Sequence, residues 1–315
     1  MTKWPLPAHV PAICAAVLAA AATPAAAQDT TPQEQGSDQI IVEGDLENDS
    51  GESTRERVLR IGRQINLPAR SGLPAARFRA PLCVMVSGLP DNIAEVVKAR
   101  IEENAQALRG VRIAGADCKA NAFVGFLNNV NDAVKTLEEE QKWLFEGLKS
   151  YQRDRIYRGS DAVRSWHAFS TLNEDGTEAV VEGSGDRARG LGSLVNQTER
   201  ASRINRQQSA MVGAVVLIET AALEEKTLRQ IADYASVRIL ASVSDEVTSD
   251  ANTPPTILTL FNEEFAPPAI TDFDMAYLTS LYELPSTSRD PQIIATAVDR
   301  YLAILKEQEA NEAGG

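Results

Sequence analysis

Residues 82–127 constrain the fold most, because two short apolar runs flank a segment with helical periodicity. The runs, residues 82–86 and 122–127, have the length and composition of buried strands. Pro90 and Asp91 open the segment between them, and Gly110 follows its end. Its apolar residues share one helical stripe: Ile93, Val97, Ile101 and Leu108. We therefore expect a βαβ unit with two parallel strands.

The patterns that follow predict a single α/β domain over residues 80–310. Amphipathic spacing predicts helices over 131–149 and 223–243 and two more near 271–283 and 291–307. Alternation predicts an antiparallel hairpin of strands 165–171 and 177–181, and residues 214–218 predict a third buried strand. The expected fold class is α/β: a mixed three-layer domain with a βαβ start, an antiparallel hairpin and a helical C-terminus. Residues 311–315 are expected to fray.

Two cysteines fall at matching places in the βαβ unit. Cys83 lies at the start of the first strand, and Cys118 lies just before the second. Parallel neighbouring strands bring these ends together, so we predict a disulfide between them. The alternative, a reactive or metal-binding thiol pair, would require CxxC spacing or neighbours that lower the thiol pKa, and the sequence offers neither.

The first 27 residues have the pattern of a secretory signal peptide. Lys3 supplies the positive start, residues 10–23 form a short apolar core, and Ala25–Ala27 fits a cleavage site after Ala27. This apolar core is shorter than the roughly 20 residues that span a bilayer, and no later run approaches that length. We therefore expect a periplasmic or secreted protein without a membrane span, in a compartment that favours disulfides.

Cleavage would change what the chain offers for chemistry. It leaves 288 of the 315 residues, shifts the net charge from −13 to −14, and removes Cys14 and His9. A surface this acidic repels phosphate backbones, so no nucleic-acid partner is expected.

Residues 28–79 predict a disordered arm, acidic at first and then basic. Residues 28–54 carry eight acids and no base, and such a segment buries too little apolar surface to fold. Within it, residues 38–44 resemble the short extended segment by which outer-membrane receptors contact the coupling protein TonB; the alternative is a passive piece of linker. Residues 55–79 carry seven arginines and one acid. They predict either an arm for phosphate-bearing lipid or polymer, or a basic strap on the chain's own acidic domain.

Candidate catalytic residues are few and weakly specified. His167 is the single histidine after cleavage, and its alternation with Trp166 and Ala168 indicates a partly exposed strand residue. Four glycines within 183–192 lack the GK[ST] ending of a phosphate-binding loop and indicate a surface loop. Glu219 and Asp233 are the acids we select for general acid–base chemistry, because both flank the helix that lines the cleft in the metalloprotease fold that the chain resembles, as described in the next paragraph. We expect no metal site and no cofactor.

The order of these elements resembles the catalytic domain of the zincin metalloproteases, over about residues 82–283. In that family a tight turn and a helix with a D-x-x-x-L-x-x-L-Y pattern follow the active-site helix, and residues 256–261 and 274–282 offer both. The zinc motif HExxH is replaced by residues 230–234, Gln-Ile-Ala-Asp-Tyr. The resemblance therefore implies a zincin shell without its zinc ligands or its catalytic glutamate. The layout is also similar to that of uncharacterised exported proteins of Gram-negative bacteria.

Three functions remain open at this point. The first is a non-enzymatic envelope protein that binds an unidentified envelope protein or polymer. The second is a hydrolase that uses carboxylates such as Glu219 or Asp233 on an extracytoplasmic polymer. The third is a metalloprotease with unusual ligands. A cleft that holds two facing carboxylates would favour the second. The sequence does not indicate an oligomeric state.

Overall fold

The computed structural model describes residues 52–67, 73–146, 148–159, 161–173, 207–248, 253–261 and 266–314. The chain divides into two compact units, Met1–Glu43 and Gly44–Gly315, and all described residues belong to the second. The expected signal peptide, residues 28–51 of the arm, which include the TonB-like segment, and the glycine-rich segment 183–192 lie outside the described residues. These expectations stay predictions.

A mixed five-stranded sheet forms the centre of the unit. The strands are β1 (Arg77–Phe78), β2 (Val84–Ser87), β3 (Ala122–Leu127), β4 (Val163–Leu172) and β5 (Gln208–Glu219). β2, β3 and β5 lie side by side in parallel, and β4 pairs antiparallel with β5 as an edge strand. β1 pairs in parallel with the first part of β5, at Ala210 and Met211. The expected βαβ unit is therefore confirmed, and β5 joins three different strands.

The antiparallel pairing differs in part from the sequence expectation. We expected β4 to pair with residues 177–181, which lie outside the described residues, and did not foresee its ten-residue register with β5. β5 also begins at Gln208, six residues before the expected start. Its first two residues are polar, yet both are buried, which explains why hydropathy alone placed the start too late.

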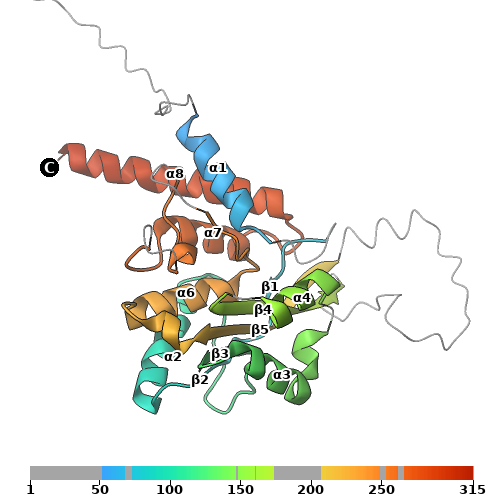
Figure 1. Cartoon of the computed structure of the whole chain (residues 1–315). Helices are drawn as coiled ribbons and strands as arrows, with labels where there is room; N and C mark the ends of the chain where they lie inside the picture. The colour runs from blue at the N-terminus through green and yellow to red at the C-terminus, as the bar shows by residue number, and fades with distance from the viewer. Residues whose placement is uncertain are drawn as a thin grey trace, which may run out of the picture. The chain divides into compact units, whose positions relative to one another are not determined.

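Helices cover the sheet on both sides, and two further layers follow on one side (Figure 1). The helices are α1 (Thr54–Ile65), α2 (Asp91–Gln106), α3 (Val130–Glu140), α4 (Ser150–Arg158), α6 (Leu228–Leu240), α7 (Asp272–Glu283) and α8 (Asp290–Gly314). α3 and α4 lie on one face of the sheet, and α2 and α6 lie on the other. α7 packs against α6, and α8 packs against both α7 and α1. The expected three layers are therefore too few, because the terminal helices add a stack beyond α6.

α1 overturns part of the predicted disordered arm. Residues 54–65 form a helix because Ser53 and Glu56 make a capping box and because Val58, Ile61 and Ile65 align on one apolar face. All three side chains are at most 1% exposed. Gly62 lies against Ile294 of α8, where an added Cβ would come within 2.9 Å of the isoleucine. The sequence did not predict this helix, because its apolar stripe has only three residues and lies among many arginines.

Two arginines of this segment bind the chain's own domain. Arg55 forms an ion pair with Asp299 of α8 at 2.5 Å. Arg77 is only 3% exposed and donates to the carbonyl oxygens of Leu284 and Pro285. Burial lowers the pKa of Arg77 to about 10. These contacts favour the basic strap over an arm that reaches for phosphate, and they place the start of the folded domain well before the predicted Ala80.

Two helix boundaries also differ from expectation. The single helix expected over 131–149 ends at Glu140 and is followed by a 3₁₀ turn, Lys142–Phe145, and by α4. The predicted frayed tail, 311–315, is helical as far as Gly314, although residues 306–314 are exposed. Alanines and glutamates, both strong helix formers, account for this extension.

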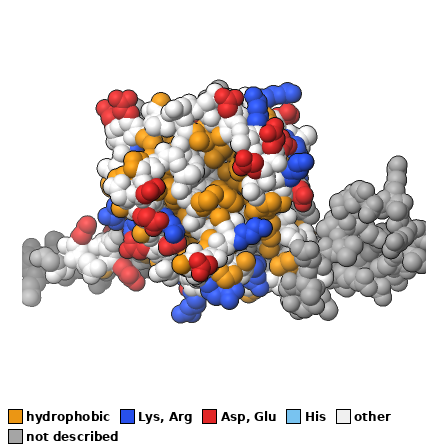
Figure 2. Space-filling model, turned by 90° about the horizontal axis from the view of Figure 1, so that it is seen from below, with side chains coloured by type: hydrophobic (Ala, Val, Ile, Leu, Met, Phe, Trp, Pro, Cys, Tyr) orange, Lys and Arg blue, Asp and Glu red, His pale blue; other side chains and the backbone are white. Residues whose placement is uncertain are grey.

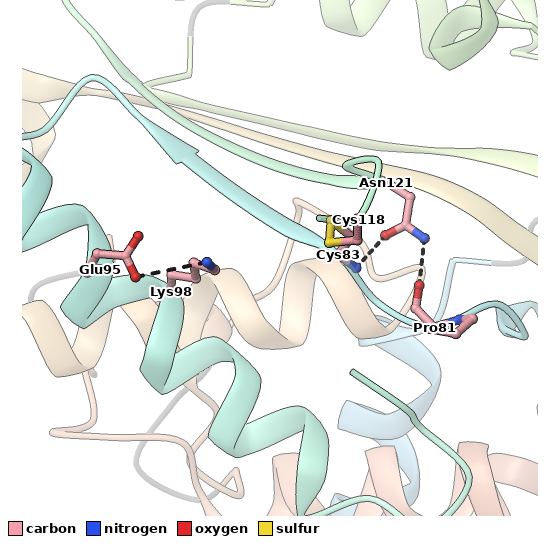
Figure 3. Close-up of a disulfide and its surroundings, with 6 residues drawn as sticks. All are labelled: Pro81, Cys83, Glu95, Lys98, Cys118 and Asn121. Carbon is pink, nitrogen blue, oxygen red and sulfur yellow. Dashed lines mark hydrogen bonds and ion pairs between the residues drawn. A yellow bond between two sulfur atoms is a disulfide. The ribbon is translucent and has the colours of Figure 1, made fainter. Parts of the chain in front are cut away.

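The predicted disulfide is confirmed at the start of the βαβ unit (Figure 3). Cys83 and Cys118 are bonded, with their Cα atoms 6.1 Å apart. Beside them, the Asn121 side chain accepts from the Cys83 amide and donates to the Pro81 carbonyl oxygen. The bridge closes a loop of 35 residues and so contributes about 3–4 kcal/mol by chain entropy.

Helical cover is incomplete on the side of α3. Met85, Phe123, Val215 and Trp166 form one row across the sheet by register. Val215 and Trp166 are buried, whereas Phe123 is half-buried and Met85 is 46% exposed. The space-filling view from below shows hydrophobic side chains in the middle of the surface that it draws (Figure 2). The cover therefore thins toward the β2 edge.

Whether α1 belongs to the folded core can be tested with a matched pair of variants. Ile61→Ala should lower the free energy of unfolding by about 2–5 kcal/mol, because it deletes a fully buried side chain. Arg63→Ala, on the exposed face of the same helix, should change it by less than about 0.5 kcal/mol. Urea denaturation followed by circular dichroism measures both. If neither variant changed the free energy of unfolding, the original prediction of a disordered arm would be favoured instead.

Candidate binding pocket

A pocket of about 230 Å³ lies between the start of the edge strand β4 and helix α6. Residues 161–163 form one side, and Tyr234 and Arg238 of α6 form the floor. Asp245 lies beside them, and Val247, Leu258 and Phe261 supply apolar walls. The volume is below the roughly 300–1,000 Å³ of common small-molecule pockets, so it suits one small group rather than a large ligand.

α6 brings Tyr234 and Arg238 together because they are four residues apart, one above the other on the same helix face. A capping box of Thr227 and Gln230 begins the helix. Arg238 Nε donates to Tyr234 Oη at 3.0 Å, and the guanidinium carbon lies 5.1 Å from the ring centre. Each residue is only 2% exposed. The pair therefore forms a fixed polar surface on one side of a largely buried helix.

Asp245 holds this surface in place and is shared by two guanidinium groups. Its Oδ1 lies 2.6 Å from Nη1 of Arg238, and its Oδ2 lies 2.5 Å from Nη2 of Arg155 on α4. Ser165 of β4 also donates to Oδ1, at 3.4 Å. Both carboxylate oxygens are thus engaged, and the trio carries a surplus of one positive charge.

Two donors of this surface have no acceptor within the described part of the chain. Arg238 uses Nε and Nη1 in its hydrogen bonds, and none is made by Nη2. Tyr234 Oη accepts from Arg238, and its own hydrogen has no acceptor among the described residues. Burial raises the pKa of Tyr234, so its hydroxyl stays protonated and able to donate. A ligand with acceptor oxygens would satisfy both groups.

Asp233, selected from the sequence as a catalytic acid, is a structural residue instead. It is fully buried, and its carboxylate faces α2 rather than the pocket. Arg100 and Asn104 of α2 each donate to Oδ1 at 2.7 Å, and the Ile270 amide donates to Oδ2 at 2.9 Å. The carboxylate therefore joins three segments and has no room for a substrate.

Glu219, the other selected acid, ends β5 and is half-buried. Its amide donates to the carbonyl oxygen of Ala162, which fixes the backbone beside the pocket. No contact joins its side chain to Asp233 in the described ranges. The structure therefore does not bring the two predicted acids together. The acids that do line one pocket are Asp161 and Asp245, and the sequence analysis missed both.

The two residues that the zincin resemblance aligns with zinc ligands, Gln230 and Tyr234, already have hydrogen-bond partners. Gln230 accepts from the Thr227 amide and donates to the Pro267 carbonyl oxygen, at 3.0 and 2.9 Å. Tyr234 is held by Arg238. Within the described residues, no group of three or more His, Cys, Asp or Glu side chains is placed to hold a metal ion.

His167 lies where the sequence analysis did not expect it. It was predicted to be partly exposed, but it is only 6% exposed, because its ring lies against the Ile239 carbonyl group near the end of α6. Its Nε2 lies 3.1 Å from the Ile239 carbonyl oxygen, which only accepts, so Nε2 carries the hydrogen. Burial lowers the pKa of His167 to about 4. The ring is neutral at pH 7 and has a structural role.

No helix within the described ranges is both long and apolar enough to cross a bilayer.

The role of Asp233 can be tested by comparison with Glu219. Asp233→Asn should lower the free energy of unfolding by about 1.5–3 kcal/mol, since it removes the charge that Arg100 and Asn104 bind. Glu219→Gln should change it by less than about 0.5 kcal/mol. Urea denaturation at pH 7 measures both. Equal stability of the two variants would argue against a structural role for Asp233.

His167 predicts a pH dependence of stability. Its pKa is about 4 in the folded state and about 6.5 when unfolded, so the unfolded chain binds more protons between these values. Its contribution should be complete above about pH 6.5 and should fall by about 3 kcal/mol as the pH is lowered to about 4. Denaturation of the wild type and of His167→Gln at several pH values isolates the effect. Parallel curves for the two proteins would refute it.

Comparisons of the chain with known protein families, with curated proteins and with solved structures found no match. The resemblance to zincins thus rests on the order of the elements and on the antiparallel edge strand.

Proposed function

We propose that the mature chain is a non-enzymatic binding protein of an extracytoplasmic compartment, and that the pocket beside β4 and α6 is its binding site. The observation that carries the proposal is a pair of donors, Tyr234 Oη and Arg238 Nη2, that have no acceptor among the described residues and belong to two side chains lining the pocket. Buried polar groups are normally satisfied, so unpaired donors in a pocket favour a ligand there.

The proposed location has two supports. Residues 1–27 have the pattern of a signal peptide, and the Cys83–Cys118 disulfide suits an oxidising compartment. A zincin-like ancestry is part of the same proposal. In that fold an antiparallel edge strand borders the active-site cleft, and here β4 borders the pocket.

The alternative is a carboxylate-dependent hydrolase, and one observation favours it: Asp161 and Asp245 line the same pocket. Such chemistry needs one carboxylate free to act as a base or nucleophile and one that holds a proton. Both oxygens of Asp245 are bound by guanidinium groups, and Asp161 is exposed at the rim. The arrangement therefore favours binding over hydrolysis.

A fragment screen by protein-observed NMR on the mature chain tests the pocket. Hits should shift signals of Tyr234, Arg238 and their neighbours. Ala162→Trp, which places a large ring at the pocket, should abolish these shifts, whereas Ala99→Trp on the exposed face of α2 should not. Hits that map elsewhere, or that survive in Ala162→Trp, would overturn the proposed site.

The absence of catalysis is tested separately. The mature chain should show no turnover of glycans, esters or peptides. Turnover that is lost in Asp161→Asn would establish the hydrolase in place of the binding protein.

A further inference from the structure

We propose that the pocket recognises a carboxylate group carried on a short aliphatic chain, with Tyr234 Oη and Arg238 Nη2 as the donors. This inference rests on the proposed function, because it names the chemical class of ligand for the same site.

The donors suit a carboxylate in number and in type. A carboxylate accepts through two oxygens, and the pocket floor offers one phenolic O–H and one guanidinium N–H side by side. Arg238 is fixed on its other side by Asp245 and by the Ser244 carbonyl oxygen at 3.0 Å, so its free nitrogen has a set direction. Little side-chain entropy is then lost when a ligand binds.

The charges around the floor favour an anion over a neutral acceptor. Arg238 and Arg155 share the single carboxylate of Asp245, which leaves one positive charge in excess. The opposing charge is Asp161, whose exposed position at the rim places it in solvent that screens it. A ligand carboxylate beside Arg238 would supply the second negative charge, so that each of the two guanidinium groups would have a carboxylate.

The walls limit the rest of the ligand to a small apolar group. Val163, Val247, Leu258 and Phe261 line the pocket, and Phe261 meets the Tyr234 ring edge-on with ring centres 5.0 Å apart. The volume of about 230 Å³ leaves room for a few carbon atoms beside the carboxylate. Two sources share this chemistry: a small aliphatic acid, and the C-terminal residue of a peptide.

Calorimetric titration of the mature protein separates the ligand classes and the two sources. Butyrate should bind and butyramide should not, because the two differ chiefly in charge and in acceptor number. N-acetyl-Ala-Val with a free carboxylate should bind, and its C-terminal amide should not. A tighter complex with the peptide than with butyrate identifies a chain terminus as the source, and the reverse identifies a free acid.

Two variants with matched controls tie the binding to the named groups. Tyr234→Phe should weaken butyrate binding about tenfold, the value of one lost hydrogen bond, and Tyr151→Phe on exposed α4 should not change it. Asp161→Asn should tighten binding about two- to fivefold by removing a like charge, and exposed Asp154→Asn should leave it unchanged. Because Tyr234→Phe also removes an acceptor from buried Arg238, the surface variant Asp161→Asn provides a test that does not depend on folding.

Equal binding of acid and amide, or no binding of any carboxylate, would overturn this inference. Binding of neutral fragments in the pocket would still support the proposed binding function. That function is refuted only if no fragment of any kind binds in the pocket. The two failures are therefore distinguishable.

Discussion

Complete burial of α6 is the constraint on which the rest of the structure depends. The helix lies between the sheet and α7, and ten consecutive residues, from Ile231 to Leu240, are buried. Every polar side chain among them must find a partner inside the protein. Asp233 is bound by α2, and Arg238 is bound by Asp245. These contacts fix α2 on one side of α6 and the 243–247 segment on the other.

Neighbouring residues of this buried helix have different roles: Asp233 joins packed segments, whereas Tyr234 lines the pocket. Adjacent residues on a helix point about 100° apart, so Asp233 and Tyr234 face different surroundings. The carboxylate of Asp233 is fully satisfied by neighbouring segments. Tyr234 and Arg238 line the pocket beside β4, and each has one donor without an acceptor among the described residues. The pocket is therefore lined by two largely buried side chains whose hydrogen bonding is not complete within the described residues.

Local periodicity made part of this predictable. The βαβ unit and its disulfide follow from an apolar stripe and two cysteines within a short stretch of sequence, and both are present. α1 was missed because only three apolar residues carry its stripe among many charges. The pocket was missed because Asp245 lies in a loop and meets Arg155 only through the tertiary fold. One signal was available: Arg238 interrupts an apolar helix and lies four residues from a tyrosine.

The position of β5 has a consequence for the order in which the chain can fold. β5 comes last of the five strands, yet it pairs with β1, β3 and β4 and so holds the sheet together. Among the described strand pairings, only that of β2 with β3 can form before residue 208 is available. The remaining pairings span long separations in sequence, which slows folding. A chain whose central strand comes last keeps its sheet open until residues 208–219 have been synthesised.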